Sequence, residues 1–222
     1  MLLLLCLQSL DTRPLAMHAQ GSGIYEKKLE RLHARNITID STCASYKYFL
    51  HVEEDLRFDL TFKESILDTA RQWLKENTPN KWKNKKIVRV IIHVRRTSFT
   101  KPHLVQQGWS TPTTDYFRRS MSYFTNCLER VQFIVISDDQ TWCMTHINAT
   151  NIVYSTGHSP IVDMAIASLC DHAIITVGTY GWWAAWFANG VTVTQKNVPR
   201  SGSLLSNKIY RTDHYKPDWI GL

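Results

Sequence analysis

Short apolar runs alternate with amphipathic segments from residue 86 to the end of the chain. The apolar runs are rich in β-branched residues, as is typical of strands buried on both faces, and they cover 87–94, 131–136, 152–154, 173–177 and 191–194. Between them, apolar residues recur at helical spacing over 115–130, 140–146, 159–169 and 180–189. Strands that alternate with helices predict the α/β class, with a doubly wound, Rossmann-like parallel sheet.

The ends of the predicted helices carry their own signals. Ser159 followed by Pro160 predicts a helix start, with the serine as N-cap and the proline in the first turn. Gly190 is expected to close the helix that begins near residue 180. The polar stretch after the first strand contains Pro102 and Gly108 and predicts a loop.

A mainly helical pattern precedes the sheet, over residues 24–85. Residues 24–35 form a charged, amphipathic stretch. Thr61-Phe62-Lys63-Glu64 has the form of a capping box, which predicts the start of a second helix that ends by Pro79. The apolar positions of that helix recur at helical spacing and are Ile66, Ala70, Trp73 and Leu74.

The first ten residues, MLLLLCLQSL, form a strongly apolar run. The run is far shorter than the roughly 20 residues that span a bilayer, and it lacks the basic flank and clear cleavage site of a signal peptide. A weak signal-like segment and a frayed or core-packed terminus both stay open. We therefore expect three regions: a poorly ordered or weakly signal-like N-terminus at 1–23, the helical region at 24–85 and the sheet domain at 86–222.

Composition and charge narrow the classes of protein. The 222 residues are 44% hydrophobic and 20% charged, which argues for a globular protein and against a disordered chain, a fibre or a multi-pass membrane protein. Lys and Arg number 26 against 19 Asp and Glu, for a net charge of +7. The excess lies in residues 81–101, which contain no acid, whereas a general nucleic-acid binder spreads its charge more widely. The segment favours a small anionic ligand or a solvated loop, not a nucleic acid.

Several common chemistries leave no trace in the sequence. The P-loop, α/β-hydrolase and zincin motifs are absent, and so is a clear DxD metal motif. The five cysteines show no CxxC spacing, which argues against a zinc or thioredoxin-type site. Two N-x-[ST] sequons, at Asn36 and Asn148, lean toward the secretory pathway.

Ligands of doubly wound sheets bind beyond the carboxyl ends of the strands, so the residues that follow each strand are the candidates. Arg95 and Arg96 follow the first strand and suit a diphosphate, because each guanidinium grips oxygens in a fork. Gly178-Thr179, at a helix start, offers backbone N–H groups to the same anion. Asp163, in the first turn of another helix, is suited to accept from a guanine edge or a ribose hydroxyl.

Each of these features also has a structural interpretation. The two arginines suit surface salt bridges, Asp163 complements a helix dipole, and Ser137-Asp138-Asp139 has the form of a turn and N-cap. His93 ends a buried strand and suits a satisfied core histidine. The Trp-rich run 182–187 favours core packing over a stacking platform.

Four segments, in order along the chain, resemble the motifs of a known enzyme family. Residues 92–97 resemble the HxRRxD motif of α1,2- and α1,6-fucosyltransferases. Ser137-Asp138-Asp139 with Trp142-Cys143 resembles the SDDxxWC-like segment of the α1,2 branch. The remaining matches to that branch are its third motif at 159–190 and its central acceptor-side segment at 46–49 and 58–62, with a further fit at 219–220.

The chain is thereby similar to glycosyltransferase family 11, the galactoside α1,2-fucosyltransferases. The resemblance implies a GT-B-like fold, of which the sheet is the GDP-fucose-binding domain and the helical region is part of the other domain. It implies inverting transfer of L-fucose from GDP-fucose to the 2-hydroxyl of a β-galactoside-terminated glycan, without a cofactor or metal ion. It also implies the lumenal side of the Golgi membrane, through an anchor that this sequence does not clearly show.

The same resemblance implies roles for individual residues. Arg95 and Arg96 meet the diphosphate, and His93 and Asp163 meet the guanosine. Thr179 matches the hydroxyl residue beside the β-phosphate. Its neighbours in the predicted donor site are Gly178 and Tyr180, and Asp115 is a candidate for the base that takes the acceptor's proton.

Two departures from the family pattern affect the expected activity. The acid that closes HxRRxD is Ser98 in this chain, and the Gly-Asn-Gln segment that opens the family's first domain is absent. The first departure predicts slow or absent transfer with donor binding largely kept, and the second predicts a truncated first domain. The alternative to an active transferase is therefore a GDP-fucose-binding module without transfer activity.

Overall fold

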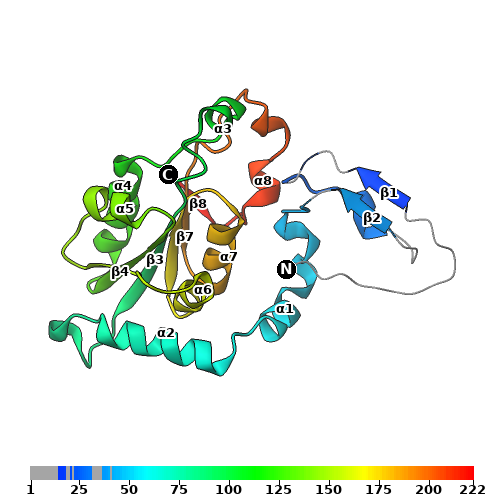
Figure 1. The fold of residues 1–222 in the computed structure, drawn as a ribbon. Coiled ribbons are helices and arrows are strands. Elements are labelled where there is room, and N and C mark those ends of the chain that lie inside the picture. Colours follow the sequence, from blue (N-terminus) through cyan, green and yellow to red (C-terminus); the bar gives the residue numbers. More distant parts are fainter. Residues whose placement is uncertain (1–14, 19–20, 22, 32–36, 41) are drawn as a thin grey trace.

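A computed structural model describes residues 15–18, 21, 23–31, 37–40 and 42–222. Its centre is a six-stranded sheet in the order β5-β4-β3-β6-β7-β8 (Figure 1). Every pair of neighbouring strands in this sheet is parallel. The strands are β3 (Val88–Val94), β4 (Val131–Ser137), β5 (Ile152–Tyr154), β6 (His172–Ile175), β7 (Thr192–Thr194) and β8 (Ile220–Gly221). The predicted α/β class and parallel, Rossmann-like sheet are confirmed.

The strand order changes direction at the centre of the sheet. The chain runs outward from β3 through β4 to β5, then returns to the other side of β3 with β6 and runs outward again through β7 to β8. This is the order of a doubly wound nucleotide-binding sheet, and its reversal between β3 and β6 opens a crevice at the carboxyl ends of those strands. The fold thus selects one place for a ligand before any side chain is considered.

Helices cover both faces of this sheet (Figure 1). Along β3, Ile91 contributes to one core with helices α2, α6 and α7, whereas Val90 and Ile92 contribute to the other core with α4 and α5. The alternation follows from the two-residue period of a strand. The helices of this part are α3 (Pro102–Gln107), α4 (Thr114–Cys127), α5 (Gln140–His146), α6 (Pro160–Ser168), α7 (Thr179–Ala188) and α8 (Arg211–His214).

Four elements of the sheet domain were not predicted: α3, β8, the 3-10 helix η5 (Leu205–Asn207) and α8. Helix α3 lies in the expected loop, although it has proline at its first position and Gly108 as a left-handed C-cap, both recognised helix-end signals. Strand β8 has only two residues, too few for a hydrophobic period to show.

The region before the sheet is mainly helical from residue 46 onward, whereas the described residues before it form a 3-10 helix and two short strands. Strands β1 (Leu15–His18) and β2 (Ile37–Asp40) form a parallel pair, so helix was the wrong expectation for the latter. The 3-10 and α-helices are η1 (Lys27–Arg31), η2 (Tyr46–Tyr48), η3 (Leu50–Val52), α1 (Glu53–Asp59), α2 (Glu64–Glu76) and η4 (Asn80–Trp82), with η5 (Leu205–Asn207) farther on. The apolar run at 1–10 and the sequon at Asn36 lie outside the described residues, and the division at residue 85 stays a prediction.

Two predicted helix ends need correction, and a third, the N-cap at Ser159, is confirmed. Helix α2 begins at Glu64 with Lys63 at its N-cap, so the capping box does not form; Phe62 instead packs against Phe187, with 5.1 Å between ring centroids. Ser159 is the N-cap of α6, but its hydroxyl makes no capping hydrogen bond. Helix α7 is closed by Asn189, not by Gly190, since asparagine also tolerates the left-handed conformation seen there.

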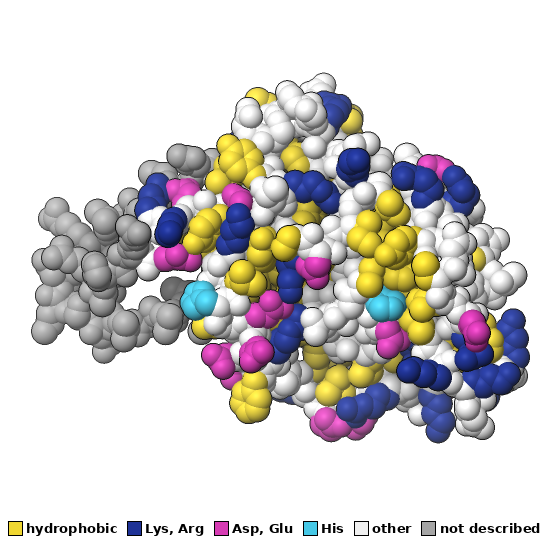
Figure 2. All heavy atoms as spheres, turned by 180° about the vertical axis from the view of Figure 1, so that it is seen from behind, with side chains coloured by type: hydrophobic (Ala, Val, Ile, Leu, Met, Phe, Trp, Pro, Cys, Tyr) yellow, Lys and Arg dark blue, Asp and Glu magenta, His cyan; other side chains and the backbone are white. Residues whose placement is uncertain are grey.

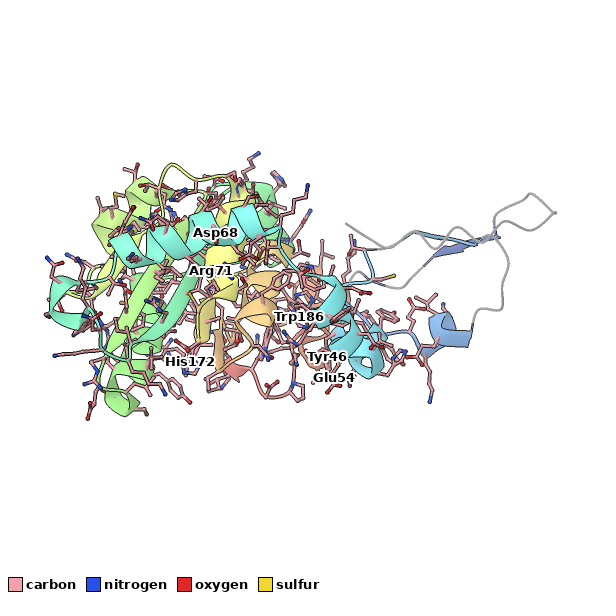
Figure 3. All side chains as sticks on the ribbon, turned by 90° about the horizontal axis from the view of Figure 1, so that it is seen from below. Tyr46, Glu54, Asp68, Arg71, His172 and Trp186 are labelled. Atoms are coloured by element: carbon pink, nitrogen blue, oxygen red, sulfur yellow. The ribbon has the colours of Figure 1, made fainter. Side chains whose placement is uncertain are left out.

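The helical segment before the sheet shares its core with the sheet domain. Ala70, Trp73 and Leu74 of α2 are buried in the same cluster as Trp182 and Trp186 of α7. The predicted core positions of α2 and the core packing of the Trp-rich run are therefore confirmed. Figure 3 labels Tyr46 and Trp186, two members of this cluster, where the segment around α1 meets the sheet domain. None of the helices in the described part of the chain is long and apolar enough to cross a bilayer.

Strand β3 separates the basic segment into two groups. Lys81, Lys83, Lys85 and Lys86 are exposed before the strand, and Arg95 and Arg96 follow it. A strand of this length spans roughly 23 Å, so the two groups lie beyond opposite ends of β3. In Figure 2, Lys and Arg side chains are spread over the visible face, with several close together at its lower right. The lysines thus fit the solvated loop, and only the arginines lie where a ligand is expected.

Candidate functional site

A cavity of about 510 Å³ lies at the carboxyl edge of the sheet, where β3, β4 and β6 end. This is the crevice that the strand order predicts. The residues that line it are His93, Arg95, Ser98, Phe99, Ile136, Ser137, Asp138, Pro160, Asp163, Val177, Gly178, Thr179 and Tyr180. The structure therefore brings together six of the predicted site residues, and it leaves Arg96 and Asp115 outside the lining.

Two helices begin at this cavity. Gly178 is the N-cap of α7, with Thr179 and Tyr180 in its first turn, and Pro160 and Asp163 lie in the first turn of α6. The N-terminal end of a helix carries partial positive charge and unpaired N–H groups. Gly178 has φ +99, a backbone conformation that residues with a side chain rarely adopt. A Cβ at this position would lie 3.9 Å from Arg95 Cγ. The wall formed by α7 is thus suited to a phosphate.

His93 forms the inner wall of the cavity as a neutral ring. Only 4% of its surface is exposed, and burial lowers its pKa to about 4. Its ring centroid is 5.5 Å from that of Tyr180. Gly181 packs directly on the imidazole, because a Cβ there would lie 2.3 Å from Nδ1. Nδ1 has no hydrogen-bond partner among the described residues, so the satisfied core histidine was the wrong interpretation.

Asp163 faces the same cavity from α6. Its Oδ1 accepts a hydrogen bond of 2.6 Å from the Ser155 hydroxyl. Burial raises the pKa of Asp163, against the hydrogen bond from Ser155 and the nearby His158, which lower it. A partly buried carboxyl group with one oxygen engaged keeps acceptor capacity for N–H or O–H groups of a ligand.

Arg95 projects into the cavity between two partners. Its Nη1 donates to Asp138 Oδ2 at 2.8 Å and its Nη2 donates to Ser98 Oγ at 3.0 Å. Its backbone N–H donates to Thr176 Oγ1 at 2.8 Å, which ties the end of β3 to the end of β6. The guanidinium is therefore aimed by one carboxylate and one hydroxyl.

Asp138 organises the whole turn that follows β3. Besides Arg95, it accepts from the backbone N–H groups of Arg96 and Thr97, at 2.9 and 3.1 Å, and from the Thr97 hydroxyl. Burial raises the pKa of Asp138, but the hydrogen bonds from Thr97 and Arg96 and the charge of Arg95 hold it below its usual range. The sequence interpretation as a turn residue missed this role, although the position directly after a strand was a signal for it.

Arg96 points away from the cavity, toward α5. Its guanidinium carbon lies 4.2 Å from the centroid of Trp142, and its Nε donates to Asp139 Oδ2 at 3.3 Å. Asp139 is also the N-cap of α5, accepting from the Trp142 N–H at 3.1 Å, as its predicted turn and N-cap role requires. The structure thus places only one of the two arginines, Arg95, in the lining of the cavity.

Asp115 lies on the first turn of α4 with an exposed side chain. Its two oxygens accept from Arg118 and from Arg119, and these hydrogen bonds lower its pKa. A carboxylate held by two guanidinium groups outside the cavity is poorly placed to take a proton from a bound acceptor. The structure does not bring Asp115 to the other candidates.

The described residues contain no group of three His, Cys, Asp or Glu side chains that could hold a metal ion. What the cavity does hold is one guanidinium, two helix N-termini, the two partly buried carboxyl groups of Asp138 and Asp163, and a neutral imidazole. Together, this fold and this site define an α/β protein whose crevice is suited to a nucleoside diphosphate.

The chain belongs to glycosyl transferase family 11, whose family model matches residues 8–222. Among curated proteins, it is 29% identical to "Galactoside alpha-(1,2)-fucosyltransferase 1" of Oryctolagus cuniculus over 188 residues, which cover 80% of this chain and 49% of that protein. The protein of the same name from Ateles belzebuth is also 29% identical, with 50% of its length covered. The chain thus spans about half the length of these relatives. The family predicted from the motifs is confirmed.

Two solved structures are similar at low identity. They are titled "Crystal structure of POFUT1 in complex with GDP (crystal-form-III)", at 12% identity, and "Crystal structure of NodZ alpha-1,6-fucosyltransferase soaked with GDP-fucose", at 13%. The TM-scores are 0.49 and 0.46, with 76% and 72% of this chain covered and 57% and 55% of those chains.

Proposed function

We propose that this chain carries the donor site of a galactoside α1,2-fucosyltransferase. The reaction moves L-fucose from GDP-fucose to the 2-hydroxyl of a β-galactoside-terminated glycan. Membership of family 11 supports the enzyme class, and the names of the relatives support the linkage and the galactoside acceptor. The observation that carries the proposal is the convergence of Arg95, Asp163 and the N-terminus of α7 on one cavity.

The cavity suggests how the donor lies in it. The diphosphate binds between the Arg95 guanidinium and the backbone N–H groups at the start of α7, beside the Thr179 hydroxyl. Guanine binds toward Asp163 and His93, because guanine presents N–H donors that a carboxylate accepts. The neutral His93 ring offers one donor and one acceptor without adding charge.

The chemistry requires stabilisation of a leaving diphosphate. Breaking the bond between fucose C1 and the β-phosphate oxygen leaves the electron pair on that oxygen, and negative charge grows on GDP. Arg95 and the helix N-terminus stabilise this charge because they are fixed before the reaction begins. The acceptor's 2-hydroxyl oxygen then bonds to C1 from the opposite face, which inverts the linkage, and its proton passes to a base.

Two further parts of the proposal, the independence from a metal ion or cofactor and the location in the cell, rest on the family resemblance. The reaction uses no metal ion and no cofactor, because the fixed cation and helix ends take over charge stabilisation. The base is not assigned to Asp115, whose carboxylate is already paired. The enzyme works on the lumenal side of the Golgi membrane. A module that binds GDP-fucose without transfer remains the second candidate, since Ser98 replaces the acid of the family motif.

Binding and transfer are tested separately. Titration calorimetry with GDP and GDP-fucose, with and without EDTA, measures the donor site of this chain, and Arg95→Gln is the matched loss-of-charge variant. Transfer is measured with labelled GDP-fucose and a β-galactoside disaccharide. Binding that resists EDTA together with fucosylated product supports the proposal. Binding without product supports the second candidate, and no binding of GDP overturns both.

A further inference from the structure

The second arginine of the strand-end pair is enclosed by α5. Its guanidinium lies 4.2 Å from the centroid of Trp142, close enough for a cation–π contact. The His146 ring also stacks on that indole, with 4.5 Å between ring centroids and nearly parallel planes. Arg96 therefore rests on an indole that a second contact holds in place.

Hydrogen bonds connect Arg96 to both carboxylates of the turn that follows β4. Asp139 accepts from the Arg96 Nε and also caps the helix that carries Trp142. Asp138 accepts one hydrogen bond from the Arg96 backbone N–H and another from the Arg95 Nη1. A shift of Arg96 therefore moves the backbone from which Arg95 projects, and it disturbs the carboxylate that aims Arg95.

We infer that Arg96 and Trp142 are positioning residues, which hold the turn so that Arg95 alone meets the diphosphate. This inference rests on the proposed function, because it concerns the same donor site. It assigns different tasks to two adjacent arginines. Arg95 acts on the ligand, and Arg96 acts only through Arg95. An indole suits this task because its flat face matches the planar guanidinium.

The test is a set of GDP titrations of the full chain in two backgrounds. In the wild-type background, we expect Arg95→Gln to weaken GDP binding by more than about tenfold. Arg96→Gln and Trp142→Leu should each weaken it about three- to tenfold. In the Arg95→Gln background, the same two substitutions should cost nothing further, because their effect passes through the side chain already removed.

Matched variants separate this role from general damage. Trp142→Phe keeps a ring under Arg96, and we expect it to restore most of the affinity that Trp142→Leu loses. Trp82→Leu removes an indole that Lys81 contacts at 5.3 Å, away from the cavity, and should leave GDP binding as it is. Should Trp142→Leu fail to fold, as judged by circular dichroism, Trp142→Phe and Arg96→Gln in both backgrounds still decide the question.

If the wild-type chain binds GDP, the proposed function stands, and either of two results would then overturn the inference alone. In the first result, Arg96→Gln lowers GDP affinity as much as Arg95→Gln does, and the two losses add in the double variant. This would show that Arg96 contacts the diphosphate itself. Trp142→Leu that folds and binds GDP like the wild type shows that the indole positions nothing. A wild-type chain that does not bind GDP overturns the proposed function, and the inference with it.

Discussion

Arg95 Nη1 lies 2.8 Å from Asp138 Oδ2, and this ion pair joins the turn after β3 to the end of β4 at the mouth of the cavity. The two side chains come from strands that are neighbours in the sheet and more than 40 residues apart in the sequence. The pair gives the guanidinium a defined direction before a ligand arrives. Pre-orientation of this kind is what a leaving diphosphate requires.

Replacement of the carboxylate of that pair should weaken donor binding. Asp138→Asn removes the charge that Arg95, Arg96 and Thr97 contact, and charge-assisted hydrogen bonds contribute about 1.5–3 kcal/mol each. We expect a loss of GDP affinity of about tenfold or more, measured by calorimetry. Asp68→Asn, an exposed acid on α2 that pairs with Arg71 (Figure 3), is the matched control and should bind GDP like the parent.

Restoration of the family acid at Ser98 should have little effect on GDP affinity. Arg95 already has a carboxylate partner in Asp138, and its side chain is 39% exposed. Exposed ion pairs contribute only about 0.2–1 kcal/mol, so Ser98→Asp should change GDP affinity by less than about fivefold. The second measurement is the rate of single-turnover fucose transfer, by this chain joined to the rest of the first domain. A large gain in rate would show that the acid has a task which Asp138 does not perform.

The contact between Gly181 and His93 should limit substitution at the helix. A Cβ at position 181 would lie 2.3 Å from the His93 Nδ1, and overpacking of a buried site costs about 1–3 kcal/mol. Gly181→Ala should therefore lower the free energy of unfolding by that amount in urea titrations. The double variant with His93→Ala should be less unstable than the sum of the two single variants, because the second change removes the obstructing ring.

Burial of His93 predicts acid sensitivity. The pKa of His93 is about 4 in the folded chain and about 6.5 in an unfolded one, so the unfolded state binds more protons between these values. Stability therefore falls as the pH falls through this window, by about 2 kcal/mol from pH 6.5 to pH 5. His93→Asn lacks this titration. Urea unfolding at both pH values should show a smaller loss for the variant, and an equal loss would place the imidazole in contact with water.

Nucleotide selectivity tests the assignment of the base-binding end. Asp163 retains an acceptor oxygen toward the cavity. Guanine offers N–H donors at N1 and at its 2-amino group, two positions at which adenine has none. GDP should bind at least about tenfold more tightly than ADP. Asp163→Asn should reduce this ratio rather than binding of both nucleotides equally. Equal affinity for GDP and ADP in the parent chain would remove Asp163 from the guanine contact.

Local patterns by themselves determined most of the architecture. β-branched runs and helical periodicity predicted five of the six sheet strands and helices α4 to α7, because buried strands and amphipathic helices each impose a period on the chain. The strand-end rule and the motifs also led to His93, Arg95, Asp163 and the start of α7. Each of these lies where a strand or helix ends, and that position is visible in the sequence.

Only the tertiary structure decided what those residues contact. Arg95 and Arg96 are neighbours of the same chemical type, yet one lines the cavity and the other rests on Trp142. The direction of each side chain depends on how β4 and α5 pack beside β3, which no local period encodes. Asp138 likewise had the form of a turn residue until strand pairing placed it beside Arg95. Long-range packing assigned these roles because hydrogen bonds and ring contacts act across space, between residues that the sequence keeps apart.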